Sequence, residues 1–142
     1  MSTTNIWLAF GGGLSFLAAA LHIAVIFGGP DWYRFVGAGE KMAQMAERGD
    51  IAATLITLGI ASILTIWGLY ALSGAGLIMR LPLLPYALLA ITSVYLLRGL
   101  VLLPMYFLKP DMISAFWVWS SAICLGYGIT HAVGLWRGWS SL

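Results

Sequence analysis

Four long apolar runs decide what this chain can fold into. They cover about residues 5–28, 51–74, 81–104 and 112–137. Each run exceeds the ~20 residues that a helix needs to cross the hydrocarbon core of a bilayer. Only 8% of the residues are charged, against roughly 25% in a soluble domain, and the runs lack the alternating pattern of a barrel strand. We therefore expect an all-α integral membrane protein, an antiparallel four-helix transmembrane bundle that forms a single domain over residues 1–142.

The cations of the loops indicate an orientation. With four spans, loops 1 and 3 lie on one side of the membrane, and loop 2 lies on the other side with both termini. The first side has Arg34, Lys41, Arg48 and Lys109, and the second has Arg80 and Arg137. The positive-inside rule counts these cations, so it places loops 1 and 3 on the cytoplasmic side of a bacterial inner membrane. The margin vanishes if Arg34 or Lys41 is folded into the protein.

Loop 1 is the longest connection and is expected to carry structure of its own. Its sequence opens with the breaker GGPD and continues to EKMAQMAERG over residues 29–50. The second piece predicts a short helix that starts near Gly39 and ends at Gly49. We expect this interfacial helix to lie as a cap over one mouth of the bundle, with Trp32, Phe35 and Val36 suited to the membrane interface.

Small and polar residues indicate which helix faces touch. Lipid offers no hydrophobic drive for helix association, so close contacts in membranes use Gly, Ala, Ser and Thr. Such residues recur at three- or four-residue steps in the first, second and fourth spans, for example at Gly11 and Ser15 and at Gly128 and His131. We expect these faces to meet, with Leu and Ile outward and with Pro104 kinking or ending the third helix.

Arg98 lies inside the third apolar run, in the sequence YLLRGLVLLP. A guanidinium at membrane depth costs at least ~2.5 kcal/mol on insertion scales, so something must hold it. One interpretation is that Arg98 binds an anionic or carbonyl group of a ligand. The structural alternative is that it snorkels past Pro104 to the loop 3 surface, or pairs with Glu40 or Glu47.

Depth along the spans brings several polar side chains toward the loop 1 face. His22 and Arg98 each lie about five or six residues past the middle of their spans, or ~9 Å, on that side. The candidates for a shared site are His22, Thr54, Thr57, Tyr95, Arg98, Trp117 and Ser121, with Glu40 in the loop. We expect a polar cavity in this half of the membrane, closed by the loop 1 helix, with His22 and Tyr95 as hydrogen-bond partners of the ligand.

Other interpretations of single residues remain open. His22 is typical of histidines that bond a neighbouring helix, and Glu40 is placed to cap its own short helix. His131 lies near the end of its span, where it can reach the interface. Cys124 is the only cysteine and suits packing as a small hydrophobe.

Several chemistries are excluded by the residues present. No span contains a carboxylate, and the two histidines lie nearly ~20 Å apart in depth, so we expect neither a metal nor a haem, and no other cofactor. The net charge of +2 is too small to indicate nucleic acid.

Three classes of function remain at this stage. The leading expectation is a small membrane protein that binds a lipid or small amphiphile, for transport or sensing. The second is a structural or accessory subunit, as a homodimer or in a larger membrane complex. The third is an intramembrane enzyme with His22 or Tyr95 as the acid–base group and Arg98 as the substrate holder, although we lean against an enzyme.

Overall fold

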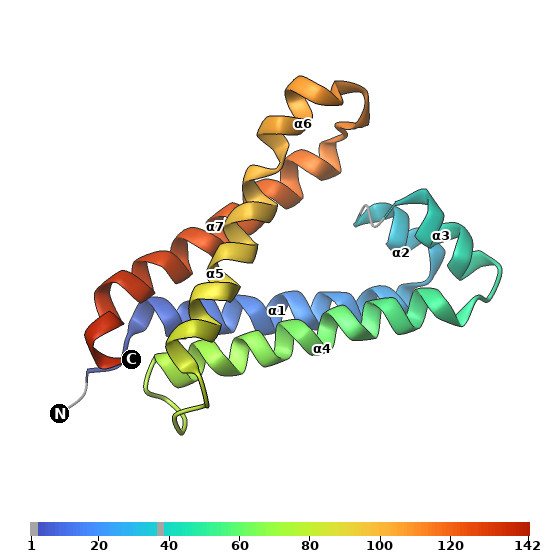
Figure 1. The fold of residues 1–142 in the computed structure, drawn as a ribbon. Coiled ribbons are helices and arrows are strands. Elements are labelled where there is room, and N and C mark those ends of the chain that lie inside the picture. The colour runs from blue at the N-terminus through green and yellow to red at the C-terminus, as the bar shows by residue number, and fades with distance from the viewer. Residues whose placement is uncertain (1–2, 37–38) are drawn as a thin grey trace. The chain divides into compact units, whose positions relative to one another are not determined.

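The computed structural model describes residues 3–36 and 39–142, and these are helical with no strand. The order of the elements can be followed in Figure 1. The helices are α1 (Ile6–Gly28), α2 (Pro30–Phe35), α3 (Glu40–Glu47), α4 (Ile51–Gly74), α5 (Leu84–Leu100), α6 (Leu102–Leu108) and α7 (Ala115–Gly138), with the 3-10 turns η1 (Pro110–Met112) and η2 (Trp139–Ser141). The expected all-α class is confirmed.

Four helical segments of the described chain are long and apolar enough to cross a membrane. They are Ile6–Gly28, Ile51–Gly74, Leu84–Leu108 and Ala115–Ser141. The first two agree with the predicted runs, whereas the third and the fourth each begin three residues and end four residues later than the predicted 81–104 and 112–137. The later start of the third span arises because Leu83 has the left-handed backbone of a turn (φ 55°). Hydropathy alone cannot detect such a turn inside an apolar stretch. The protein is therefore an integral membrane protein with four spans.

The third span is interrupted within its second half. Helix α5 ends at Leu100, Val101 links it to α6, and Pro104 follows in the first turn of α6. Proline has no N–H, so it cannot donate to the carbonyl of Leu100 as a helix requires. The expected break at Pro104 is confirmed, and it begins three residues before the proline.

The chain divides into two compact units, which we describe separately. The α5–α7 unit comprises the chain up to Ser15 together with Trp67–Leu142, and the cap unit is Phe16–Ile66. Helices α1 and α4 contribute residues to both. The expectation of a single domain stays a prediction.

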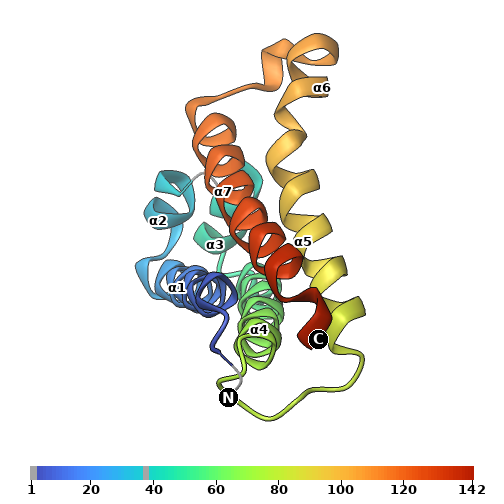
Figure 2. The same ribbon diagram turned by 90° about the vertical axis from the view of Figure 1, so that its left-hand side faces the viewer.

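Helices α5 and α7 lie side by side in the α5–α7 unit (Figure 2) because glycines let their backbones approach. A Cβ built on Gly99 would lie 2.6 Å from the backbone N of Leu125, and one on Gly128 would lie 2.9 Å from that of Leu96. Backbone atoms cannot give way as a flexible side chain can. The expected use of small residues at helix contacts is confirmed here.

Helix α1 packs on α7 in the same way. A Cβ on Gly134 would lie 2.7 Å from the Leu8 side chain, and Asn5 Nδ2 donates a hydrogen bond to the Gly134 carbonyl at 2.7 Å. Asn5 Oδ1 also accepts from the Leu8 N–H at 3.3 Å, which caps the start of α1. These contacts fix the N-terminal half of α1 within the α5–α7 unit.

The cap unit contains the short helix that the sequence predicts. Helix α3 lies between Gly39 and Gly49, both with positive φ (105° and 69°). Met42 and Met45 pack against the buried core of this unit, as their shared face suggests. The prediction of a loop 1 helix is confirmed.

Helix α2 is an addition to the predicted elements. The GGPD sequence ends α1, but Pro30 also opens a new helix, since proline suits a first turn. Tyr33 of α2 is buried, while Trp32 and Phe35 are exposed on the protein surface. Their expected position in the membrane interface stays a prediction.

A matched pair of glycine variants tests the packing of α5 on α7. Gly99→Ala is expected to lower the unfolding free energy by about 1–3 kcal/mol, since the new methyl group meets the Leu125 backbone. Gly126 of α7 has nothing within 4 Å of such a Cβ. Gly126→Ala is therefore expected to be neutral or slightly stabilising, because alanine favours helix. Thermal melts in detergent compare the two variants, and equal melting temperatures would contradict the close approach.

Candidate functional site

Arg98 is held by side chains of α7. Its Nη1 donates to Ser121 Oγ at 3.0 Å, and its Nη2 donates to Ser120 Oγ at 2.9 Å. The guanidinium also lies over the ring of Trp117, 4.8 Å from the ring centroid. The structure thus brings together Arg98, Trp117 and Ser121 from the predicted set. Ser120 was missed, because we followed one face of the fourth helix and this residue lies beside that face.

Arg98 lies nearer to the middle of its span than the sequence indicated. The span Leu84–Leu108 has its middle at Leu96, so Arg98 lies about two residues, or ~3 Å, from the centre. The prediction of about five residues was wrong because it used a span that began at residue 81. A guanidinium near the centre has a longer path to water than one near the helix end, and snorkelling explains it less well.

The charge of Arg98 is not matched by a carboxylate of its own unit. Asp111 is the one acidic residue there, and no ion pair joins it to Arg98 among the residues the structure describes. Glu40 and Glu47 belong to the cap unit, where both bind Arg34, and the alternative pairing of Arg98 with either one stays a prediction. Neutral hydroxyls and an aromatic face are therefore the groups that hold this cation.

The hydrogen atoms around Arg98 define what else could bind. Both serine oxygens accept from the guanidinium, so their own hydrogens must point elsewhere. Ser120 makes a long contact to the Trp117 carbonyl at 3.5 Å, and Ser121 has no acceptor within residues 3–36 and 39–142. A guanidinium also carries more N–H groups than these two serines accept. The site therefore presents hydrogen-bond donors, and its complement is an acceptor-rich group.

Tyr95 belongs to a different cluster, although it lies on α5 close to Arg98. Its hydroxyl shares a hydrogen bond with Ser15 Oγ at 2.8 Å, and its ring makes edge contacts with Trp67 and Tyr127. The Tyr95 side chain is buried. Its hydroxyl is thus already bonded within the core of the α5–α7 unit.

His131 completes this core cluster. Its ring lies 5.1 Å from that of Tyr95, and its Nδ1 bonds the Tyr127 carbonyl at 2.8 Å, so Nδ1 carries the hydrogen. The side chain is 0% exposed, and Nε2 has no partner in the described chain. The expectation that His131 reaches the interface was wrong. Gly11 opposes the ring, where a Cβ would lie 2.8 Å from Cε1, and so makes room for it.

The other four candidates lie in the cap unit. Thr57 Oγ1 donates to the Ala53 carbonyl at 2.8 Å and shares a bond with Tyr33 at 2.9 Å. His22 Nδ1 bonds a carbonyl of its own helix, that of Ala18, at 2.7 Å, and Thr54 is partly buried on α4. The convergence of His22, Thr54, Thr57 and Glu40 with Arg98 stays a prediction.

Glu40 takes part in an ion-pair cluster on the surface of the cap unit. Arg34 donates to both of its carboxylate oxygens, at 3.0 and 2.8 Å, and to Glu47 at 2.7 Å. The hydrogen bonds to Glu40 and then Glu47 raise the pKa of Arg34, and the bond from Arg34 lowers the pKa of Glu40. Helix α3 has no side-chain cap bond. Glu40 therefore links α2 to α3, and the expected capping role is not observed.

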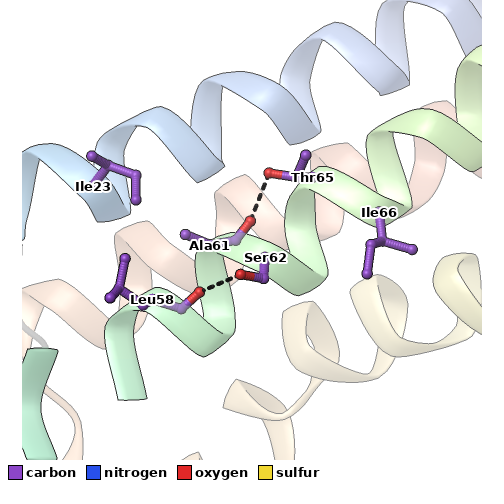
Figure 3. A pocket seen from close by; sticks show the side chains of 6 residues that line it. All are labelled: Ile23, Leu58, Ala61, Ser62, Thr65 and Ile66. Carbon is purple, nitrogen blue, oxygen red and sulfur yellow. Dashed lines mark hydrogen bonds between the residues drawn. The ribbon is translucent and has the colours of Figure 1, made fainter. Parts of the chain in front are cut away.

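An apolar groove follows α4 in the cap unit (Figure 3). Its volume is about 340 Å³, and it is lined by Ile23, Leu58, Ala61, Ser62, Thr65 and Ile66. The hydroxyls of Ser62 and Thr65 donate to carbonyls one turn earlier, both at 2.8 Å. These donors are used within the helix, so the groove offers an apolar surface to its surroundings.

Neither a metal site nor a match to a known protein indicates a function for this chain. The described residues contain no group of three or more His, Cys, Asp or Glu side chains that could hold a metal ion. No protein-family model, curated protein or solved structure matched the chain. The polar contacts of Arg98 are therefore the feature of the molecule that points to a function.

The pH dependence of the Arg34 cluster can be measured directly. Arg34 lowers the pKa of Glu40, so this pair stabilises the cap above the unfolded pKa of about 4.3 and is lost as the pH falls through the lower folded value. We expect the ¹³C NMR titration of the Glu40 carboxyl to have its midpoint below about 4.3. Arg34→Gln should raise the midpoint.

Lys41→Gln is the matched control for that titration. It removes an exposed cation from the same helix that makes no ion pair in the described chain. An equal rise of the Glu40 midpoint in both variants would contradict a specific Arg34–Glu40 pair.

Proposed function

We propose that this protein binds a lipid or small amphiphile through Arg98, in a half-membrane site of a bacterial inner-membrane protein. One observation carries the proposal: a guanidinium near the middle of a span is held by two serine hydroxyls and an aromatic face, without a carboxylate of its own unit. A charge at this depth costs several kcal/mol unless it is paired. A bound anionic or strongly polarised group would supply the missing partner.

The donors around Arg98 favour a carboxylate, a phosphate or a carbonyl as the bound group. Planar oxygen pairs suit guanidinium, since they accept two parallel N–H bonds. Leu97 is 68% exposed, and Val94 and Leu100 are also exposed. An apolar tail could therefore lie along α5 while the polar head binds Arg98, which is the arrangement of an amphiphile. We place such binding in transport or sensing.

The rival classes receive less support from the contacts. An enzyme would need an acid–base group beside Arg98, but the Tyr95 hydroxyl is bonded to Ser15 and the His22 ring to its own helix. An accessory subunit would need free small-residue faces for docking. In the α5–α7 unit, Gly11, Gly99, Gly128 and Gly134 already meet neighbouring helices. Of the described helical glycines in this unit, Gly13 of α1 and Gly126 of α7 have no atom within 4 Å of an added Cβ.

Native mass spectrometry from nanodiscs tests the proposal. We expect the wild type to retain a non-protein mass of lipid or amphiphile size, and Arg98→Gln to retain one such molecule fewer, because the amide cannot replace the charge. Arg137→Gln is the matched control, since Arg137 is an exposed cation of α7. Circular dichroism and thermal melting establish that each variant is folded. The same number of bound molecules in Arg98→Gln as in the wild type, or no bound mass in the wild type, would reject the proposal.

We also propose that loops 1 and 3 face the cytoplasm. Because Arg34 is paired with Glu40 and Glu47, the cations without an ion pair in the described chain are Lys41, Arg48 and Lys109 on that side and Arg80 and Arg137 on the other. Without Arg34 the loop cations number three against two, so the margin becomes smaller but, contrary to expectation, does not vanish. The positive-inside rule depends on these cations.

Cysteine labelling in intact cells tests this orientation. In a Cys124→Ala background, Gln44→Cys of loop 1 should react with a membrane-impermeant maleimide only after lysis. Met79→Cys of loop 2 should react before lysis. Both positions are exposed on the protein surface, so a difference in labelling reports the side of the membrane on which each loop lies. The reverse labelling pattern would show that loops 1 and 3 face the outside.

A further inference from the structure

A polar hollow lies where several elements of the α5–α7 unit begin or end. Its volume is about 360 Å³. Asn5 precedes α1, Gly74 ends α4, Leu84 starts α5, Ser141 ends η2, and all four line the hollow. Because membrane-spanning helices end near the bilayer surface, we expect this hollow at the level of lipid head groups.

Three exposed tryptophans also indicate that this end of the unit lies at the membrane interface. Trp7 begins the first span, and Trp136 and Trp139 lie at the end of the fourth. All three are exposed. Tryptophan is enriched at the boundary between hydrocarbon and water, so these side chains indicate the interface at this end of the unit.

Arg80 is the cation that lines the hollow. It makes no ion pair within the described residues. Asp111, the one acid of this unit, lies in η1 between α6 and α7, at the opposite end of these helices. Among the described residues, no acidic side chain lines the hollow, so the Arg80 guanidinium favours an anionic ligand there.

The loop around Arg80 is anchored on both sides. Ser73 Oγ donates to the Met79 carbonyl at 2.9 Å and accepts from the Leu81 N–H at 3.0 Å. Tyr70 further donates to the Pro82 carbonyl at 3.2 Å. The backbone at position 80 is thus held between two bonded residues, which reduces the entropy lost when Arg80 binds a ligand.

The same loop also presents apolar side chains. Leu77, Met79 and Leu83 are exposed at 53%, 78% and 74%. A polar hollow with a guanidinium, bordered by apolar side chains at the interface, matches the two parts of a phospholipid. Arginine binds phosphate through charge-assisted hydrogen bonds.

We propose that this hollow is a second binding site, which takes the phosphate of an anionic phospholipid at Arg80. It depends on none of the residues around Arg98 and stands whether or not Arg98 binds a ligand. The apolar border favours a lipid phosphate over free phosphate, and the two sources share the same contact with Arg80.

Native mass spectrometry of the delipidated protein in neutral detergent tests this site. The protein is titrated with phosphatidylglycerol and, in parallel, with phosphatidylcholine. We expect the wild type to bind phosphatidylglycerol more tightly, and Arg80→Gln to weaken that binding at least about tenfold, as loss of a charge-assisted contact implies. Arg137→Gln is the matched control, because Arg137 carries an equal charge in the last turn of α7 but does not line the hollow. This variant should bind phosphatidylglycerol about as tightly as the wild type.

Two more variants keep the test decisive if Arg80→Gln does not fold. Arg80→Lys retains the charge and should bind within a few-fold of the wild type, whereas Ser141→Trp fills the hollow without a change of charge and should lose binding. Arg98→Gln should keep the phosphatidylglycerol preference, which separates this site from the one at Arg98.

The outcomes assign or reject the site. If millimolar inorganic phosphate leaves phosphatidylglycerol binding unchanged, the hollow is a lipid site, as proposed. If inorganic phosphate displaces the lipid, the hollow is instead a site for the free anion, and the lipid proposal is rejected. Equal weakening by Arg80→Gln and Arg137→Gln would show general surface attraction and overturn the proposal. Full binding by Arg80→Gln or Ser141→Trp would overturn it as well.

Discussion

The contact of Arg98 with two serines of α7 is the interaction on which the account depends. A cation near the middle of a membrane span requires compensation, and neutral hydroxyls provide part of it. Ser120 and Ser121 direct the guanidinium, and Trp117 covers it with an aromatic face. A cation–π contact contributes ~0.5–2 kcal/mol, which is less than the cost of burying an unpaired charge. Part of the cost of burying the Arg98 charge is therefore left uncompensated by the protein, and an anionic ligand would compensate it.

Close packing of α5 on α7 makes that contact possible. Gly99 lies next to Arg98 in the sequence and meets the backbone of Leu125, so the two helices approach within reach of the short serine side chains. A larger residue at this position would separate the helices. The same principle operates at Gly11, which admits the ring of His131 and so closes the Tyr95 cluster. Small residues therefore set the geometry of both polar clusters in the α5–α7 unit.

The sequence predicted the elements better than the site. Apolar length gave the spans, and Gly39 and Gly49 gave the bounds of α3, because both signals are local. The expected proximity of Arg98 to Trp117 and Ser121 is present in the structure. Depth says nothing about the rotation of a helix or its exact start, so it did not reveal that the Tyr95 hydroxyl bonds Ser15 or that the His131 ring is buried. The Arg34 pairs were missed because they join two short helices whose packing is not local in sequence.

A crystal structure of the protein grown from a lipidic mesophase would show whether Arg98 binds a ligand. We expect non-protein density within hydrogen-bond distance of the Arg98 guanidinium, on the side away from Ser120 and Ser121, with an oxygen-bearing head group and an apolar tail. A guanidinium that contacts only protein side chains, or that extends to bulk water at the membrane surface, would contradict this expectation.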